Sequence, residues 1–442
     1  MMEKQLADGL ILRSLRAGGD PLRAQLPEFY DQVFAGENEP DHGLLAAWAQ
    51  DLVSGDHPTV TADDIWCVVD PAQDDRIVSA LLLIPQVWRY EDVAFGVGRP
   101  EIVATHPDYR RRGLVRALMT VAHERSESLG HLVQGITGIP HYYRQFGYTM
   151  AVELDLRVLL PFTALPKLPE GETPQYTLRP ATLSDVSSLS AWDAFLAQTS
   201  LLTAVRAPDV WRYEIDGKRA VSIAAREILI IVDQRGQGVG YVIVRNFPAR
   251  QNMAVFTYVV GPNSSYLATF HDVARGLQAY AEAHYADQMP LALAFEAAMH
   301  PSALTLAHRL MGAWQRPQPY AWYLRVPNLP RFMQTIAPVL ERRLKNSGAH
   351  NYTGEIAISF YNLKGLRLRF ADGRLAEVRE ENVEWEKAQA WFPWHLFLNI
   401  VFGFQSADEI SEFLTEAVAG GKATVLLDAL FPKRWSALYG LV

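Results

Sequence analysis

Three arginines followed directly by a glycine form the most chemically distinctive segment of the chain, at Arg110-Arg111-Arg112-Gly113. A strand predicted at residues 101–105 ends just before them, and apolar residues at helical spacing begin at Leu114. A glycine-containing turn at a helix N-terminus presents unpaired backbone N–H groups and the positive end of the helix dipole. Arginine side chains add charge-assisted hydrogen bonds. The segment predicts a site for a pyrophosphate; the alternative is a basic helix start that faces solvent.

The elements that must position this segment alternate between strands and helices, which predicts an α/β (α+β) fold. A proline-rich linker at residues 161–174 separates a first domain, residues 1–160, from a second, residues 175–326. The second domain restarts the pattern of the first, since Tyr176-Thr177-Leu178-Arg179 resembles Leu10-Ile11-Leu12-Arg13. A third domain is expected at residues 327–442. The chain therefore predicts an internal duplication followed by a distinct C-terminal domain.

The periodicity places several elements within these domains. The predicted strands cover residues 10–15, 65–69, 77–84, 101–105, 132–136, 228–232, 240–244, 254–260, 354–360, 366–370 and 377–379. The predicted helices cover parts of residues 20–54, the stretch after Leu114, residues 268–283 and residues 332–344. The last third is crowded with aromatic side chains, which indicates either an aromatic core or a pocket for an apolar ligand.

Composition excludes some classes of protein. The chain has 442 residues, a formal net charge of −8 and 49% hydrophobic residues, which is typical of a globular protein and argues against nucleic-acid binding. The single cysteine, Cys67, permits no intrachain disulfide and no cysteine-based metal site, and we expect no metal. No signal-peptide region follows the N-terminus, and the most apolar stretches are too short to span a bilayer. We therefore expect a cytoplasmic protein with no membrane partner.

The arginine–glycine segment resembles the Gcn5-related N-acetyltransferase (GNAT) motif Arg/Gln-x-x-Gly-x-Gly/Ala, with Arg110, Gly113 and Val115 at the motif positions. Val115 departs from the usual small residue. The resemblance implies acetyl-CoA as co-substrate. It implies that the backbone of Val103 and Thr105 pairs with the pantetheine arm. The pyrophosphate would be held by the segment that comprises Arg110, Arg111, Arg112, Gly113, Leu114 and Val115.

The same resemblance implies a proton donor. GNAT enzymes often use a tyrosine four residues before the glycine of a Tyr-x-x-x-Gly-Phe/Tyr run to protonate the departing thiolate, and Tyr143 has that spacing from Gly147. A phenol suits this task because its reference pKa, about 10, is above that of a thiol. The alternatives are that Tyr143 only packs, or that the neighbouring Tyr142 is the donor.

The attacking amine must lose a proton, so a general base is needed. Glu101 is one candidate, because the period of a strand places it on the same face as Val103 and Thr105. A solvated surface glutamate is the alternative. His106 and His141 also lie near the motifs, where a role in turns or packing is expected.

The whole layout resembles the enhanced-intracellular-survival (Eis) type of acetyltransferase over nearly the full length. The resemblance implies two tandem GNAT-like domains, the second degenerate, and a sterol-carrier-protein-like C-terminal domain. The second domain lacks an Arg-x-x-Gly in its counterpart segment, Tyr258-Val259-Val260-Gly261-Pro262-Asn263-Ser264-Ser265-Tyr266-Leu267. In that family the C-terminal carboxylate is the general base, which here would be Val442, where an aromatic residue is expected. The resemblance also implies a homo-oligomer, a hexamer.

Two further functions stay open at this point. The acceptor is expected to be a small-molecule primary amine, for instance a cationic aminoglycoside, and the acidic residues Glu28, Glu37, Glu39 and Asp41 could attract it. A protein-lysine acetyltransferase would share the chemistry. A binding protein for an apolar ligand or lipid, with a vestigial acyltransferase, is the alternative of a different class.

Overall fold

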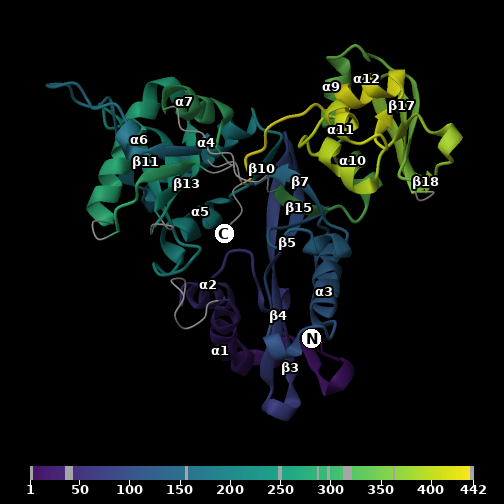
Figure 1. The fold of residues 1–442 in the computed structure, drawn as a ribbon, viewed down its shortest axis with the longest axis horizontal. Coiled ribbons are helices and arrows are strands. Elements are labelled where there is room, and N and C mark those ends of the chain that lie inside the picture. Colours follow the sequence, from purple (N-terminus) through teal and green to yellow (C-terminus); the bar gives the residue numbers. More distant parts are fainter. Residues whose placement is uncertain are drawn as a thin grey trace.

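The computed structural model describes residues 3–34, 43–154, 158–246, 251–285, 288–295, 299–311, 321–361 and 364–438. Its strands form three sheets, and each sheet is the centre of one unit of the molecule. Figure 1 shows the first unit at the bottom, the second at the upper left and the third at the upper right. This mixed α/β architecture confirms the predicted fold class. Within the described residues, no helix is both long enough and apolar enough to cross a membrane.

The first unit is a twisted sheet covered on both faces. Its strand order is β1-β2-β3-β4-β5-β6-β15-β7, with β15 at Ala321–Arg325, and β10 (Leu202–Ala204) is paired to β4. One face packs against α1 and α2, and the other packs against α3. Its elements are β1 (Glu3–Gln5), β2 (Ile11–Ser14), α1 (Leu15–Phe34), α2 (Leu44–Val53), β3 (Ile65–Asp70), β4 (Arg76–Tyr90), β5 (Val93–Thr105), α3 (Leu114–Ser128), β6 (Val133–Ile136) and β7 (Thr149–Glu153).

The helix that follows the arginine–glycine segment is confirmed. Leu114, Leu118, Val121 and Ala122 are buried on one face of α3, as their spacing predicted. In contrast, β4 and β5 extend well beyond the predicted strands. They form one long antiparallel hairpin, since their pairing continues as far as Tyr90 opposite Val93. The hairpin tip thereby reaches the third unit (Figure 1).

The second unit repeats the arrangement of the first. Its sheet has the order β8-β14-β13-β12-β11-β9, with α6 packed on it. The predicted strands and the predicted helix at residues 268–283 are all present. Its elements are β9 (Tyr176–Pro180), α4 (Val186–Ala197), α5 (Pro208–Arg212), a π-helical turn (Tyr213–Gly217), β11 (Arg226–Asp233), β12 (Gly238–Arg245), β13 (Asn252–Val260), α6 (Tyr266–His284), β14 (Ala292–Phe295) and α7 (Pro301–Met311).

The first two units exchange strands. β8 (Val158–Pro161), which follows the first sheet in the chain, pairs with β14 of the second sheet. β15 (Ala321–Arg325), which follows the second sheet, lies between β6 and β7 of the first. Each sheet is therefore completed by a strand from outside its own continuous segment, so sheet membership does not follow the domain limits expected at residues 160 and 326.

The third unit is a smaller sheet covered by helices, with the order β18-β17-β16-β19-β20. Its elements are α8 (Leu329–Thr335), α9 (Ala337–Lys345), β16 (Gly354–Ser359), β17 (Lys364–Ala371), β18 (Arg374–Asn382), β19 (Ala390–Trp391), α10 (Trp394–Val401), α11 (Ala407–Phe413), β20 (Val418–Ala419) and α12 (Gly421–Leu430). The single helix predicted at residues 332–344 is wrong, because the chain breaks at Ile336 into α8 and α9. Pro338 supplies the reason, since proline lacks an N–H and disfavours a continuous helix.

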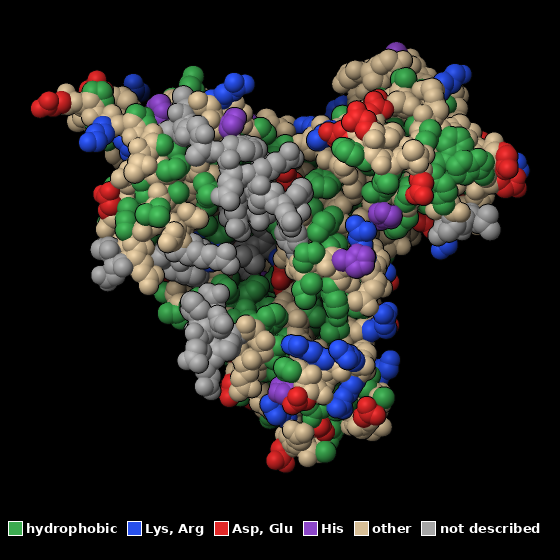
Figure 2. All heavy atoms as spheres, in the orientation of Figure 1, with side chains coloured by type: hydrophobic (Ala, Val, Ile, Leu, Met, Phe, Trp, Pro, Cys, Tyr) green, Lys and Arg blue, Asp and Glu red, His purple; other side chains and the backbone are tan. Residues whose placement is uncertain are grey.

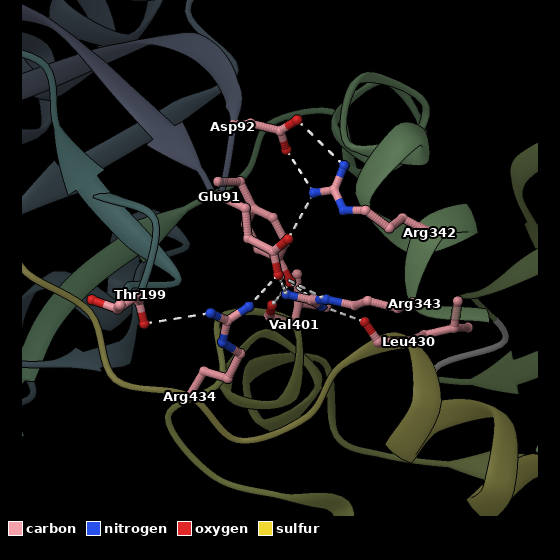
Figure 3. A network of polar contacts seen from close by, with 9 residues as sticks. Glu91, Asp92, Thr199, Arg342, Arg343, Val401, Leu430 and Arg434 are labelled. Carbon is pink, nitrogen blue, oxygen red and sulfur yellow. Dashed lines mark hydrogen bonds and ion pairs between the residues drawn. The ribbon is translucent and has the colours of Figure 1, made fainter. Parts of the chain in front are cut away.

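An ion-pair cluster fixes the third unit to the tip of the β4–β5 hairpin (Figure 3). Glu91 accepts hydrogen bonds from Arg342 at 2.8 Å and from Arg343 at 2.7 Å, and it also pairs with Arg434. Asp92 accepts a further bond from Arg342 at 2.6 Å. Arg342 and Arg343 belong to α9, whereas Arg434 belongs to the segment after α12. The cluster therefore holds both the third unit and the C-terminal tail against the first sheet.

Candidate functional site

The edge of β5 opens beside the arginine–glycine segment. β6 runs parallel to β5 and pairs with it at only two positions, Val97 with Val133 and Gly98 with Gln134. From there to the end of β5, no other strand in the described part of the chain pairs with this edge. On the side away from β4, the backbone of residues 103–105 therefore has no strand partner among the described residues. This is the segment in which Val103 and Thr105 were expected to hold a pantetheine arm.

A β-bulge interrupts β5 at Ile102. The pairing with β4 shifts between Ala80 and Leu82, and Ile102 has a positive φ of 45°. A bulge places two residues opposite one and changes the direction of the strand. The side chains therefore do not alternate regularly through this stretch of β5.

The bulge corrects one expectation about Glu101. Glu101 is opposite Leu82, and Leu82 packs in the core on the α1 and α2 side of the sheet. Val103 instead packs in the core on the α3 side, and the Thr105 hydroxyl lies 2.7 Å from that of Ser79. Glu101 is therefore not on the same face as Val103 and Thr105. The regular period of a strand predicted that it was, and the bulge breaks that period.

Glu101 is a buried carboxylate with a buried partner. It forms an ion pair with Arg99, whose side chain is fully buried. The Arg99 guanidinium also lies 4.9 Å from the ring of Trp322, a residue of β15. Burial raises the pKa of Glu101, and the charge of Arg99 opposes that shift only in part. A carboxylate with a raised pKa is a stronger base than an exposed one.

The helix α3 begins without a side-chain cap. Gly113 is its N-cap residue, with a φ of 74°, and no atom lies within 4 Å of the position that a Cβ would take. Arg111 also has a positive φ, 65°. An uncapped first turn leaves its backbone N–H groups available to an external acceptor. The exposed turn at Gly113 therefore suits the approach of an anion.

The three arginines do not have equal roles in the structure. Arg112 donates to the Asp108 carbonyl at 3.2 Å and lies 4.7 Å from the ring of Tyr109. Arg110 and Arg111 are exposed, and the side chain of neither has a hydrogen-bond or ion-pair partner among the described residues. Figure 2 shows Lys and Arg side chains gathered over the lower part of the first unit, where α3 begins. Two cationic side chains are thus available beside the open helix end.

The two sequence motifs meet in space. Arg116, in the first turns of α3, donates to Gln145 at 3.1 Å and lies 5.3 Å from the ring of Phe146. Both partners belong to a short 3₁₀ helix, η5 (Tyr142–Phe146). The tyrosine motif and the arginine–glycine segment are therefore parts of one region, as a shared site requires.

Tyr143 is buried within η5, with 6% of its surface exposed. Its ring packs against those of Tyr142, Tyr148 and Tyr323, with centroid distances of 5.2, 6.3 and 5.9 Å. Gly138 lies against it so closely that a Cβ there would be 2.8 Å from a ring carbon. Tyr142 is only half-buried. Tyr143 is thus the more deeply buried of the two neighbouring tyrosines, with three tyrosine rings and Gly138 around it.

The remaining expected residues have these positions. His106 accepts a hydrogen bond from the Asp108 N–H and begins the turn before the arginines, which is the turn role expected for it. Leu114 is buried, and Val115 is half-buried against the same core. Val442 lies outside the described residues.

The C-terminal tail can be followed as far as Leu438. Ala437 forms a parallel bridge with Thr203 of β10, and its N–H donates to the Leu202 carbonyl. β10 is in turn paired with β4, so that Thr203 is opposite Arg89. The tail runs parallel to β10, and β10 is antiparallel to β4. The tail therefore points toward the part of β4 that contains Leu82, the residue paired with Glu101.

The second unit lacks the open helix end. Its equivalent helix, α6, is capped by Ser265, whose side chain accepts a hydrogen bond from the Ala268 N–H. Tyr266, the first residue of α6, is stacked against His300 at 4.7 Å. The segment that replaces Arg-x-x-Gly is thus closed by its own side chains.

Comparison with known protein families identifies the class of the first part of the chain. Residues 23–151 match the family model described as acetyltransferase (GNAT) domain. The chain therefore contains a GNAT acetyltransferase domain at residues 23–151, which makes it an acyltransferase. No curated protein matches the sequence.

Solved structures share the fold over nearly the whole chain. A GCN5-related N-acetyltransferase from Anabaena variabilis is 13% identical with a TM-score of 0.66, and the match covers 97% of this chain and 99% of that one. One from Kribbella flavida is 15% identical with a TM-score of 0.59, covering 97% of both chains. Eis1 from Mycobacterium abscessus is 13% identical with a TM-score of 0.59, covering 98% of this chain and 100% of that one. Identities this low show a common fold.

Proposed function

We propose that the protein transfers the acetyl group of acetyl-CoA to a primary amine on a small cationic molecule, with an aminoglycoside-like compound as the first acceptor to test. The observation that carries the donor half is the uncapped start of α3 beside the unpaired edge of β5. The exposed side chains of Arg110 and Arg111 fit the charge of a pyrophosphate. The backbone of Val103 and Thr105 fits the amide groups of a pantetheine arm.

The acceptor half rests on Glu101. In the proposed reaction the amine nitrogen attacks the thioester carbonyl, the C–S bond breaks, and the amine proton passes to a base. Glu101 faces the α1 and α2 side, away from Val103, so donor and acceptor would approach from different sides of β5. Tyr143 would give its phenolic proton to the departing thiolate. Val442 stays a second proposed base, supported by the direction of the described tail.

The competing functions have less support. Phe392 and Phe397 are fully buried in the core that the third unit shares with the first, so these two side chains pack against protein and are not exposed to a lipid. We keep the sterol-carrier-protein-like character of the third unit and a homo-oligomeric assembly as proposals that follow from the resemblance to Eis-type enzymes.

The experiment is a thiol-release screen with acetyl-CoA against aminoglycosides, polyamines and lysine-containing peptides. We expect turnover with small polycationic amines and a large loss of kcat in Tyr143→Phe at little cost in acetyl-CoA binding. Turnover with peptides alone would favour a protein-lysine acetyltransferase. Acetyl-CoA binding without thiol release on any amine would contradict the proposal.

A further inference from the structure

Tyr323 lies beside the candidate site of the first unit, although it comes from a segment of the chain that follows the second sheet. It lies on β15, the strand that follows the second sheet in the chain and joins the first sheet between β6 and β7. Only 1% of its surface is exposed. Its hydroxyl accepts a hydrogen bond from the backbone N–H of His141 at 2.5 Å, and its ring lies 5.9 Å from that of Tyr143.

The segment that Tyr323 holds is the one that orients Tyr143. His141 is the N-cap residue of η5 and has a φ of 69°, and Gly138 has a φ of 148°. Positive φ values are uncommon for residues with a side chain, so the path between β6 and η5 depends on contacts from outside the turn. The hydrogen bond to Tyr323 is such a contact, and it enters at the residue directly before η5.

Two contacts limit the position of Tyr143. A Cβ on Gly138 would be 3.2 Å from the phenolic oxygen, so Gly138 lies close to that oxygen. Tyr323 lies against the ring itself and fixes the backbone two residues earlier. A phenol that donates a proton needs its oxygen held in one place relative to the reacting sulfur, so a small shift in η5 would lower the rate.

We propose that Tyr323 is a positioning residue for Tyr143, supplied by the strand that follows the second sheet in the chain and completes the first. This inference rests on the proposed function, because it takes Tyr143 as the proton donor. Tyr323 transfers no proton itself. It acts by holding the His141 N–H and packing against the Tyr143 ring, so a strand from far along the chain completes the site.

The test is a double-mutant cycle on the full-length protein. Tyr323→Phe keeps the ring and removes the acceptor, so we expect kcat to fall about 3- to 10-fold with an unchanged KM for acetyl-CoA. In a Tyr143→Phe background the same change should have no further effect on kcat. Tyr285→Phe is the matched control, because it removes a buried tyrosine hydroxyl that bonds the Arg245 carbonyl at 2.9 Å in the second unit.

The outcomes separate this inference from the proposed function. If Tyr143→Phe leaves kcat unchanged, the donor assignment is wrong. Suppose that Tyr143→Phe lowers kcat. The positioning role alone is then overturned if Tyr323→Phe leaves kcat unchanged, if its effect on kcat equals that of Tyr285→Phe, or if its effect adds to that of Tyr143→Phe. Should Tyr323→Phe fail to fold, hydrogen exchange on the unaltered protein decides, since a fast-exchanging His141 amide would show that the Tyr323 bond does not hold this turn.

Discussion

Replacing Glu91 with alanine should release the third unit and the C-terminal tail from the first sheet. Glu91 receives hydrogen bonds from α9 and from the tail, and its side chain is 15% exposed (Figure 3). Removing one partner of a buried ion pair costs about 3–5 kcal/mol, because the opposite charges are left unpaired. Arg342 is 44% exposed and retains its ion pair with Asp92, so solvent and that carboxylate reduce the free-energy cost of removing Glu91. We expect Glu91→Ala to weaken this docking by about 3 kcal/mol.

Asp92→Ala is the matched control for that change. Asp92 is the next residue, is 66% exposed, and contacts only Arg342 within this cluster. An exposed ion pair contributes below about 1 kcal/mol. Hydrogen exchange and limited proteolysis of residues 431–438 measure the docking of the tail directly. A global unfolding experiment is less suitable, because a protein of several units need not unfold in one step. Equal effects of Glu91→Ala and Asp92→Ala would refute this reasoning.

The same cluster predicts a dependence on pH. Burial would raise the pKa of Glu91, but hydrogen bonds and charge from Arg342, Arg343 and Arg434 outweigh it and hold the pKa below the usual value of 4.5. A carboxylate with a lowered pKa in the folded state adds stability at neutral pH. That stability is lost as the pH falls from about 4.5 through the lowered pKa. Protection of the tail should therefore persist at neutral pH and disappear in acid.

Three further predictions concern the site. Gly138→Ala should lower kcat about tenfold or more, because a Cβ placed 2.8 Å from the Tyr143 ring must displace it; unchanged kcat would show that the ring is free to move. If Glu101 is the base, kcat/KM should fall as the pH drops through its raised pKa, and the Glu101→Gln variant should be slow at every pH. The Tm of this variant must also be measured, because Arg99 loses its ion-pair partner. Deleting Val442 should lower turnover at saturating amine if its carboxylate is the base, and unchanged turnover would exclude it.

Local patterns in the sequence were enough to predict the helix and the turn on which the proposed donor site rests. The spacing of Leu114 and Leu118 predicted α3, and Gly113 marked its start, because both signals lie within one short segment. Tyr143 was identified from its spacing to Gly147 and is buried beside α3.

The rest depends on contacts between distant segments. Tyr323 lies 182 residues from His141, and nothing in the local pattern of β15 indicates that it joins the first sheet. The bulge at Ile102 was missed because no glycine marks it, and it moved Glu101 to the other face. Pro338 was the exception, since a break between α8 and α9 could have been predicted from the proline alone.

The central claim is that the open start of α3 binds the pyrophosphate of acetyl-CoA for transfer to an amine. Titration calorimetry with acetyl-CoA on the unaltered protein and on the double variant Arg110→Ala/Arg111→Ala tests it most directly. Each lost charge-assisted bond is worth about 1.5–3 kcal/mol, so the account predicts that Kd rises at least about tenfold. The loss should be smaller at high salt, where such charges are screened. An unchanged Kd in the double variant would contradict the account.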